Sequence, residues 1–338
     1  MSGEGVLMDP SRIVTAEDIR TAAQARALGT PASALRAAVA DGRLTRLWPA
    51  CYIPTQLWEE LPPQQRALAI HYAFHAKTGA RITYSHTSAA LAHGVSLLRV
   101  PQELHLVGDP KPGYRHRSLR THRLPDVATH RVRTDLDLPA TSLEQTALAC
   151  ARTLPMLDAL VVLDQLAARR VDPTRLAHLL RTSPGTHGNQ QALLAVGAAD
   201  ARAGSPVETL TRWRLREAGL PEPELRIEVR TSQGRSFLDL GWPQLRVAVE
   251  VDGRIKYTDY GPTQEVLIAE REREKRIQNV GWLIRRTGWH EQSRGPRDFL
   301  VELAHCLLAQ QLRLGLPPLD LDRVRRRVAR MQPIFPPR

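Results

Sequence analysis

Hydrophobic and polar positions at the start of the chain follow two helical repeats and then two short alternating runs. An alanine-rich segment between Thr15 and Gly29 is followed by one that starts at Pro31 and stops at Gly42. Proline at the first helical position and glycine just past the last are typical helix boundaries. The runs RLTRLW and CYIP come next, separated by a Pro-Ala pair. The pattern predicts a helix-turn-helix with a β-wing over residues 1–60.

Polar side chains of the second helix and of the wing are the candidates for DNA contact. In this layout the second helix enters the major groove and the wing approaches the phosphates. The expected base contacts are Ser33 and Arg36, and the expected phosphate contacts are Arg43 and Arg46. The alternative is a small helical cap whose arginines face solvent. The pattern of residues leaves both interpretations open.

Helical and strand-like patterns alternate in residues 61–200 and predict a mixed α/β domain. Residues 64–79 and the segment MLDALVVLDQLAARR are helical in pattern, and ELHLVG is a strand-like run. Ser85, His86 and Ser88 invite a catalytic interpretation. No GxSxG turn surrounds them and no acid can be assigned, so helix capping or local hydrogen bonding explains them better. The other histidines show no HExxH spacing, and the loop AADARAGSP marks the end of the domain.

A helix followed by a strand-rich segment is predicted for residues 205–315. Ser205 and Pro206 are the expected cap and first residue of a helix that ends at Gly219. The runs RIEVRT, SFLDLGW and LRVAVEVDG follow as strands, and the charged run EVLIAEREREKRIQNVG and a closing amphipathic stretch follow as helices. Residues 316–338 are expected to form a basic tail that either touches the DNA backbone or is disordered.

Three acids, Asp239, Glu250 and Asp252, interrupt strands that otherwise suit a buried sheet. Successive side chains alternate across a strand, so Glu250 and Asp252 share a face, and Asp239 comes near Glu250 if register and twist cooperate. Clustered carboxylates repel each other unless a cation or an arginine compensates, so a bound divalent cation is the functional hypothesis. The alternative is that Asp252 begins a turn and Glu250 pairs with an arginine of the following helix. For Glu208 the local alternative is a capping box with its N-cap serine.

Composition adds a strong positive charge to this picture. The 338 residues carry a formal net charge of +12 and a pI near 10.4, which favours a polyanion, and double-stranded DNA is the natural partner. Only four of the 47 basic residues are lysine. The length favours two or three domains. Three cysteines without CxxC spacing predict neither a zinc knuckle nor a disulfide framework. No long apolar run or signal-peptide pattern appears, so we expect a cytoplasmic protein without a membrane span.

The segments SPVETLTRWRLREAGLPEP, FLDLGWPQLRVAVEVDG, EREREKRIQ and GWLIRRTGW place acids on a helix and on two strands in a specific order. Together they cover about residues 205–292, and this region resembles the PD-(D/E)XK nuclease core, specifically its very-short-patch-repair-like branch. The resemblance implies that Asp239 and Glu250 hold Mg²⁺ or Mn²⁺. It also implies that Glu208 orients metal-bound water and that Arg286 faces the phosphate or the acids.

One position departs from the nuclease pattern. The lysine of the Glu-x-Lys pair is replaced by Asp252, which could be a further ligand or a general base. Lys256, four residues later, could return an ammonium group to the same space. The alternative is a solvated Lys256 in an inactive site. The family pattern also has an acid and an arginine on the following helix, here Glu270 and Arg273, which are implied to support the ligands.

The front of the chain carries a second set of matching segments. These are VTAEDIRTAAQARALGTPASALRAAVADGRLTRLWPACYIP, YSHTSAALAHGV and LPATSLEQTALACAR. Over about residues 12–165 the chain resembles the AbiEi-type antitoxin and regulator family of type IV toxin-antitoxin systems. The resemblance implies an N-terminal winged helix, a second mixed α/β domain, and DNA as the partner, with a toxin protein as a further candidate partner.

These observations predict a multidomain α/β protein. The predicted parts are a winged helix DNA-binding domain at 1–60, an AbiEi-like mixed α/β domain at 61–200, a restriction-endonuclease-like α/β core at 205–315 and a basic tail at 316–338. The expected function is that of a DNA-binding, Mg²⁺-dependent endonuclease that hydrolyses phosphodiester bonds. The alternative is an antitoxin-like transcriptional regulator whose nuclease-like domain is inactive and serves binding or structure. The sequence leaves open whether the protein is an enzyme and makes no prediction of its oligomeric state.

Overall fold

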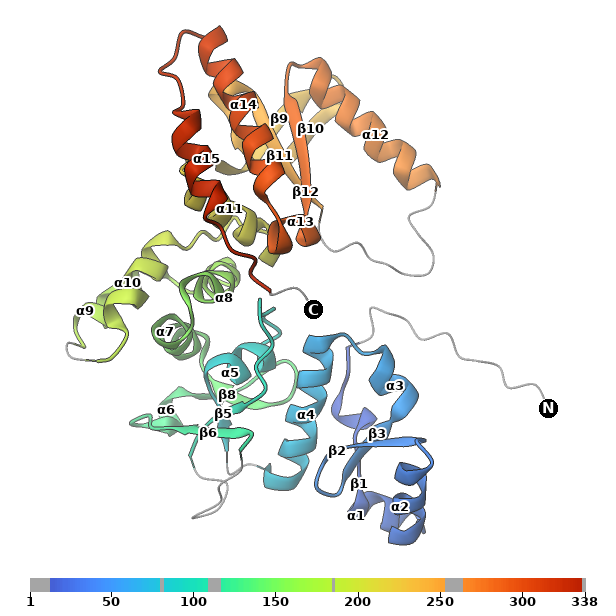
Figure 1. The fold of residues 1–338 in the computed structure, drawn as a ribbon. Coiled ribbons are helices and arrows are strands. Elements are labelled where there is room, and N and C mark those ends of the chain that lie inside the picture. The colour runs from blue at the N-terminus through green and yellow to red at the C-terminus, as the bar shows by residue number, and fades with distance from the viewer. Residues whose placement is uncertain (1–12, 80–81, 109–116, 184–185, 253–263, 336–338) are drawn as a thin grey trace. The chain divides into compact units, whose positions relative to one another are not determined.

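The chain divides into two compact units, residues 1–166 with 170–199 and residues 167–169 with 200–338. The structure is a computed structural model that describes residues 13–79, 82–108, 117–183, 186–252 and 264–335. Three sheets with surrounding helices confirm the predicted multidomain α/β class (Figure 1). None of the helices in these ranges is long and apolar enough to cross a membrane.

Residues 13–54 form a small antiparallel sheet and two short helices. The sheet order is β1–β3–β2. The elements are β1 (Arg20–Thr21), α1 (Ala22–Ala27), α2 (Ala32–Ala40), β2 (Leu44–Trp48) and β3 (Cys51–Pro54). Helix α2 buries Leu35 and Ala38 against the rest of the unit and leaves Ser33 and Arg36 exposed. The second helix and the hairpin therefore lie where the sequence predicts them.

The first predicted helix is wrong in its extent. Thr15 caps only a single turn, η1 (Ala16–Asp18), through reciprocal bonds with Asp18. The next residues pair with β3, and α1 begins only after Thr21, whose side chain accepts a hydrogen bond from the backbone N–H of Gln24. Two capping sites lie within the same alanine-rich segment, and pairing with β3 decides which of them starts the longer helix.

A mixed sheet with the order β6–β5–β4–β8–β7 completes the first unit. Its strands are β4 (Thr83–Tyr84), β5 (Leu104–Val107), β6 (Leu119–His122), β7 (Arg131–Arg133) and β8 (Pro139–Thr141). The helices are α3 (Thr55–Glu60), α4 (Pro63–Thr78), α5 (His86–Ala92), α6 (Val127–His130), α7 (Leu143–Thr153), α8 (Met156–Ala168), α9 (Pro173–Arg181) and α10 (Asn189–Ala198). One hydrophobic cluster runs from Cys51 and Ile53 to Phe74, Ile82 and Leu106. The front sheet and the mixed sheet therefore share a core.

A four-stranded sheet with the order β12–β11–β10–β9 is the centre of the second unit. Strands β9, β10 and β11 pair antiparallel, whereas β11 and β12 are parallel. The strands are β9 (Glu224–Thr231), β10 (Gly234–Trp242), β11 (Val247–Asp252) and β12 (Leu283–Gly288). The helices are α11 (Pro206–Ala218), η3 (Pro243–Leu245), α12 (Gln264–Asn279), α13 (Trp289–Arg294), α14 (Arg297–Arg313) and α15 (Leu321–Ala329).

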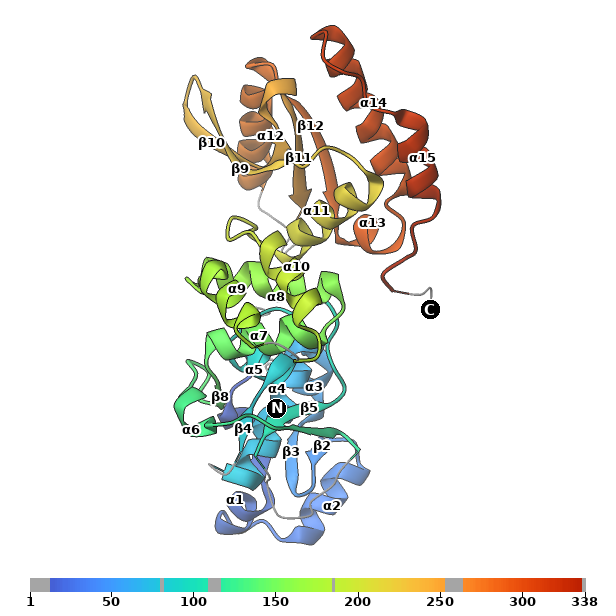
Figure 2. The ribbon, with the colours of Figure 1, turned by 90° about the vertical axis from the view of Figure 1, so that its left-hand side faces the viewer.

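Helices cover both faces of this sheet, as Figure 2 shows for α12 on one side and for α14 and α15 on the other. Val247, Val249 and Val251 pack on the face of α11, α14 and α15. Ala248 packs on the opposite face with Ile277 of α12. The predicted alternation along β11 is confirmed, and it directs Glu250 to the α12 face.

The basic C-terminal segment folds onto the second unit. Asp320 caps α15 through the N–H of Arg323, and Val324 and Val328 are buried in the core. The buried guanidinium of Arg214 on α11 donates to the carbonyl of Gln332 at 2.8 Å. The alternative of a disordered end is therefore wrong for the helix and for residues 330–335, because apolar residues at helical spacing give α15 a face to bury.

Candidate functional site

The register of β10 and β11 brings Asp239 and Glu250 together. Gly241 pairs with Ala248 and Leu240 with Val249, so the next position along the hairpin sets Asp239 beside Glu250. The ladder ends there, and Asp239 Oδ2 accepts a hydrogen bond from the backbone N–H of Val251 at 2.8 Å. Asp239 and Glu250 therefore lie next to each other, as the sequence permits but does not require. We refer to Asp239 and Glu250 as the carboxylate site.

A twist in β10 explains how an acid occurs in the middle of a buried strand. Leu238 packs on the α12 face, whereas Leu240 packs on the face of α14 and α15. In a regular strand two residues at this spacing would lie on the same face. Directly across the hairpin, Arg226 of β9 has a left-handed backbone with φ 53°. The change of face lies at Asp239, which therefore turns its carboxylate toward β11 instead of into either core.

Burial and mutual repulsion make the charged forms of both acids unfavourable. Burial raises the pKa of Asp239, and the charge of Asp252 raises it further. Burial likewise raises the pKa of Glu250, with Asp239 and Glu270 adding to the effect. Glu250 is 8% exposed. Its Oε1 atom is buried and has no hydrogen-bond partner among the described residues. An unpartnered oxygen between carboxylates that repel each other is suited to a bound cation.

Arg273 of α12 occupies the other side of Glu250. Its guanidinium lies 3.1 Å from Glu250 Oε2 and 2.9 Å from Glu270 Oε1, and it also donates to the carbonyl of Phe237. Arg286 of β12 bonds the same Glu270 oxygen at 2.8 Å. Hydrogen bonds from Arg273 hold the pKa of Glu270 below its ordinary value. The interpretation in which Glu250 pairs with an arginine of the following helix is therefore confirmed.

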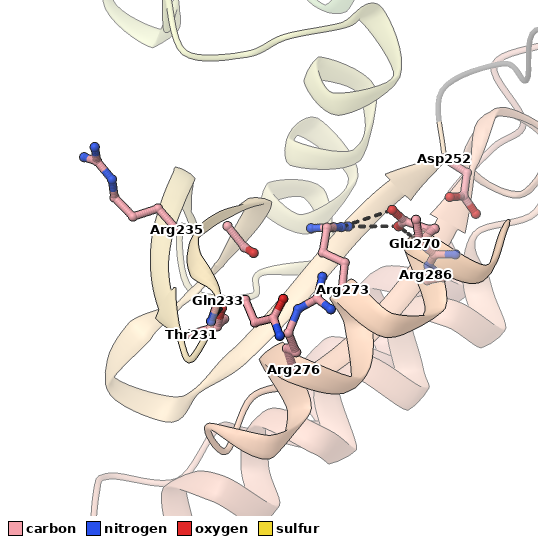
Figure 3. A pocket seen from close by; sticks show the side chains of 10 residues that line it. Thr231, Gln233, Arg235, Asp252, Glu270, Arg273, Arg276 and Arg286 are labelled. Atoms are coloured by element: carbon pink, nitrogen blue, oxygen red, sulfur yellow. Dashed lines mark hydrogen bonds and ion pairs between the residues drawn. The ribbon is translucent and has the colours of Figure 1, made fainter. Parts of the chain in front are cut away.

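A surface cleft of about 700 Å³ is lined by Glu270, Arg273 and Arg286, whereas Asp239 and Glu250 are not among its lining residues (Figure 3). In the close view Arg273 and Arg286 turn toward Glu270, while Arg235 points away from them. The residues that line the cleft are Thr231, Gln233, Arg235, Ser236, Asp252, Ala269, Glu270, Arg273, Arg276 and Arg286. We call this the arginine cleft. Its basic side chains suit a phosphate-bearing ligand, because guanidinium groups bind phosphate oxygens in pairs.

The nuclease pattern departs at Asp252 and Lys256, and of these Asp252 is the last residue of β11. Asp252 is exposed and lines the arginine cleft. Lys256 lies outside the described residues. Among the described residues, no three carboxylates bring one oxygen each within 4.8 Å of one another. A cation at the carboxylate site would therefore be held by two protein carboxylates, a ligand number that Mg²⁺ accepts because it retains several waters.

Glu208 acts as a helix cap. Its Oε2 accepts a hydrogen bond from the N–H of Gly204 at 2.8 Å, and its Oε1 accepts one from the Ser205 hydroxyl at 2.9 Å. Ser205 in turn accepts from the N–H of Glu208 at 3.2 Å. The predicted cap at Ser205 is confirmed, but the Glu208 carboxylate reaches the N–H of Gly204, one residue before the cap, and Glu208 is absent from the described lining of the arginine cleft.

The predicted DNA-contacting residues lie on the surface of the first unit. Ser33 and Arg36 are exposed on α2. Arg46 is exposed on β2, and Arg43 is exposed just before it, 3.2 Å from Asp41. All four side chains are accessible to a macromolecular ligand.

Sequence reasoning missed two kinds of residue. Arg235 and Arg276 line the arginine cleft, but arginine is so frequent in the chain that no local signal distinguishes them. The sequence also does not identify which arginine of α12 pairs with Glu250, and the structure shows that it is Arg273. Its spacing of three residues after Glu270 was the available signal, since such pairs meet on one helix face.

Comparisons with known proteins add similarity without a function. No family model matches the chain. The uncharacterized proteins MT2308 and Rv2248 of two Mycobacterium tuberculosis strains are each 28% identical to it over 251 residues, which cover 73% of this chain and 86% of theirs. The crystal structure of the RV2827C protein from Mycobacterium tuberculosis is similar with a TM-score of 0.34 and 20% identity, over 58% of this chain and 76% of that one. Function is therefore argued from the residues of the site.

Proposed function

We propose that the chain is a cytoplasmic, double-stranded DNA-binding protein whose second unit is a Mg²⁺- or Mn²⁺-dependent endonuclease with a PD-(D/E)XK-like core. The observation that carries the proposal is the buried Oε1 of Glu250 next to Asp239, which has no hydrogen-bond partner among the described residues. Burying a carboxylate oxygen without a partner costs free energy, and a cation bound there would recover it. The arginine cleft, which shares Arg273 with the carboxylate site, supports a phosphodiester as the substrate.

Asp239 and Glu250 would hold the cation, since carboxylate oxygens are the ligands that Mg²⁺ prefers. When bound, such an ion polarises a phosphoryl oxygen and lowers the pKa of its water. The chain's own residues supply the rest. Arg286, Arg276 and Arg235 bind phosphate oxygens and offset the charge that grows on them during cleavage.

Three further side chains orient or assist the reacting groups. Arg273 fixes the Glu250 side chain through Oε2 and leaves Oε1 available. Asp252, exposed at the rim of the cleft, is positioned to accept a proton from water. Lys256, outside the described residues, is proposed as the relocated ammonium that offsets phosphate charge.

The first unit is proposed to deliver this activity to DNA as a winged helix. In this proposal α2 enters the major groove with Ser33 and Arg36 at the base edges, and Arg43 and Arg46 reach phosphates from the hairpin. The exposure of the four side chains supports this role. The AbiEi-type resemblance makes a toxin protein a further candidate partner.

Plasmid nicking by the purified full chain with Mg²⁺ or Mn²⁺ tests the enzyme. We expect nicking that EDTA abolishes and that Asp239→Asn removes. The matched control is Asp298→Asn, an exposed aspartate of α14 in the same unit, which should nick like the wild type. If no substrate is nicked while gel-shift binding stays intact and equal in Asp239→Asn, the endonuclease proposal fails.

A second candidate function is a DNA-binding regulator whose nuclease-like unit does not cut. The ion pair of Arg273 with Glu250 favours it, because an arginine already compensates the buried acid without a metal. The two candidates differ in one measurement. Mg²⁺ should raise the melting temperature of the wild type and not that of Asp239→Asn if the carboxylate site binds metal, and should affect both equally if it does not.

A further inference from the structure

Three histidine side chains that the sequence separates widely meet in the mixed sheet of the first unit. His86 is the first residue of α5, His105 lies in β5 and His122 is the last residue of β6. One ring nitrogen of each lies within 4.8 Å of the others. No other group of three acids, histidines or cysteines in the described part of the chain meets this distance. We refer to these residues as the histidine cluster.

The rings are close enough to share one ligand. Nδ1 of His105 lies 2.9 Å from Nε2 of His122. The ring centroids of His86 and His122 are 3.7 Å apart in a stacked arrangement. Two nitrogens bound to one tetrahedral zinc ion are roughly 3.3 Å apart, given Zn–N distances of about 2.0–2.1 Å. Small ring rotations would therefore direct all three nitrogens at a single ion.

The backbone around the histidine cluster is fixed by hydrogen bonds between α5 and β5. The N–H of Ser85 donates to the carbonyl of His105 at 2.9 Å, and the N–H of His105 donates to the Ser88 hydroxyl at 2.9 Å. These bonds hold His86 in a left-handed conformation with φ 51°, which is unfavourable for a residue with a side chain. A strained backbone that aims a ring into a cluster is a feature of functional sites.

Parallel pairing of β5 and β6 supplies the other two rings. His105 pairs with Arg120, and His122, two residues further along β6, lies on the same face as Arg120. The Arg120 guanidinium is the nearby positive charge, and Glu103 lies 3.1 Å from it and offsets it. The register of β5 and β6 therefore brings the histidines together, as the turn of a helix does in an HExxH motif. Because the residues are far apart in sequence, no local motif marks them.

The imidazoles of the cluster are in the form that binds metals. Burial, together with the neighbouring histidines and Arg120, lowers the pKa of His86 to about 3 and that of His105 to about 4. Burial, and then the charge of Arg120, also lowers the pKa of His122, with Glu103 acting in the opposite direction. All three rings are therefore neutral near pH 7 and keep a lone pair for a metal ion.

We propose that His86, His105 and His122 bind a zinc-class transition-metal ion in the first unit. Neutral imidazole nitrogens suit zinc, copper or nickel and not Mg²⁺ or Ca²⁺, whose ligands are oxygens. Ser85 Oγ lies 3.1 Å from Nδ1 of His86, so a hydrogen bond there leaves Nε2 of that ring for the metal. Three protein ligands leave a fourth coordination position for water or an incoming ligand.

The ion would tie an edge strand to its unit. β6 is the outer strand of the mixed sheet, and His122 would anchor its last residue to β5 and to the start of α5. Because the ion binds the folded chain and not the unfolded one, it adds stability in proportion to its affinity. The site is independent of the carboxylate site and of the proposed endonuclease activity.

Metal titration of tag-free, EDTA-treated full chain tests the proposal. Asp239→Asn is the background, so that the carboxylate site does not contribute. We expect one Zn²⁺ per chain by calorimetry and a Co²⁺ complex whose visible absorption has the intensity of four-coordination. His122→Gln and His105→Ala should each weaken Zn²⁺ affinity by at least about 100-fold. The control His178→Ala, an exposed histidine of α9, should bind like its parent.

The folding of each variant is checked by far-ultraviolet circular dichroism without metal. His122→Gln is the informative variant if His105→Ala does not fold, because its amide keeps the size of the side chain. Zn²⁺ affinity unchanged in a folded His122→Gln, or a Co²⁺ spectrum typical of six-coordination by water, would overturn the proposal.

Discussion

The carboxylate site of the second unit lies on the two inner strands of its sheet, and the histidine cluster of the first unit includes an edge strand. Both place polar side chains where they are at least partly buried, but they differ in how charge is handled. Glu250 remains beside other acids and is compensated by Arg273. The histidines carry no charge, since burial lowers the pKa of each ring. In the two proposals, the carboxylate site therefore takes a hard cation with phosphate, and the histidine cluster takes a softer metal ion.

The largest expected effect is on cleavage. Glu250→Gln keeps the size of the side chain and removes its charge, so Mg²⁺-dependent nicking should fall by at least about 100-fold. The rate is measured on supercoiled plasmid at saturating protein. Glu302→Gln, an exposed glutamate of α14, is the matched control and should cleave normally. Equal rates for both variants would remove Glu250 from the active site.

The next effect is on stability and distinguishes Arg273 from Arg276, two of the arginines of α12. Arg273→Ala leaves the buried Glu250 without its partner and should lower the free energy of unfolding by about 2–3 kcal/mol. Arg276→Ala breaks only a 3.8 Å pair with the exposed Glu272 and should cost less than about 0.5 kcal/mol. Urea denaturation in metal-free buffer measures both. Similar losses would mean that the Glu250 pair is no more than a surface contact.

A third prediction concerns the neutral imidazoles of the first unit. Buried His71 lies in α4, and burial lowers its pKa from 6.5 to about 4. Between these pH values the unfolded chain binds a proton that the folded chain excludes, so stability falls as pH falls through this window. His71 alone contributes about 1 kcal/mol per pH unit to the slope, and the histidines of the cluster, whose pKa values are also lowered, add to it. Denaturation of metal-free protein between pH 7 and pH 4.5 should show this slope, and His71→Leu should reduce it. An identical slope in the variant would place the titrating group elsewhere.

The smallest expected effect tests whether both units contact DNA. Arg36→Gln in the first unit and Arg235→Gln in the second each remove one phosphate or base contact. Each should reduce the slope of log affinity against log salt concentration by up to about 0.9. Fluorescence anisotropy between low and moderate salt measures the slope. Arg181→Gln, exposed on α9, should leave it unchanged, and a change as large in this control would indicate nonspecific attraction by net charge.

Local signals in the sequence were enough to predict helix boundaries but not the start of α1. Ser205 and Pro206 place α11 correctly because a cap and a first-turn proline act within one turn. The start of α1 depends on pairing with β3, which lies more than one helix away along the chain. Contacts between distant segments decide between local signals of similar strength, and periodicity does not contain them.

The carboxylate site was likewise predictable only where it depends on the local pattern of residues. Alternation along β11 correctly set Glu250 apart from the valines, whereas the twist at Asp239 depends on the left-handed Arg226 across the hairpin. The histidine cluster was not predictable, because β5–β6 pairing assembles it from residues without a shared motif. Clusters made by sheet register become visible only when the register is known.

Helix α15 determines when the second unit can finish folding. Val324 and Val328 fill the same core as Val247 and Leu300, so α15 is part of the sheet's support. Chains fold from the N-terminus as they leave the ribosome. The first unit can complete its core during translation before the second, which must wait until Val324 and Val328 have emerged. A chain that stalls or is cut before residue 324 would therefore display a folded first unit without a finished second unit.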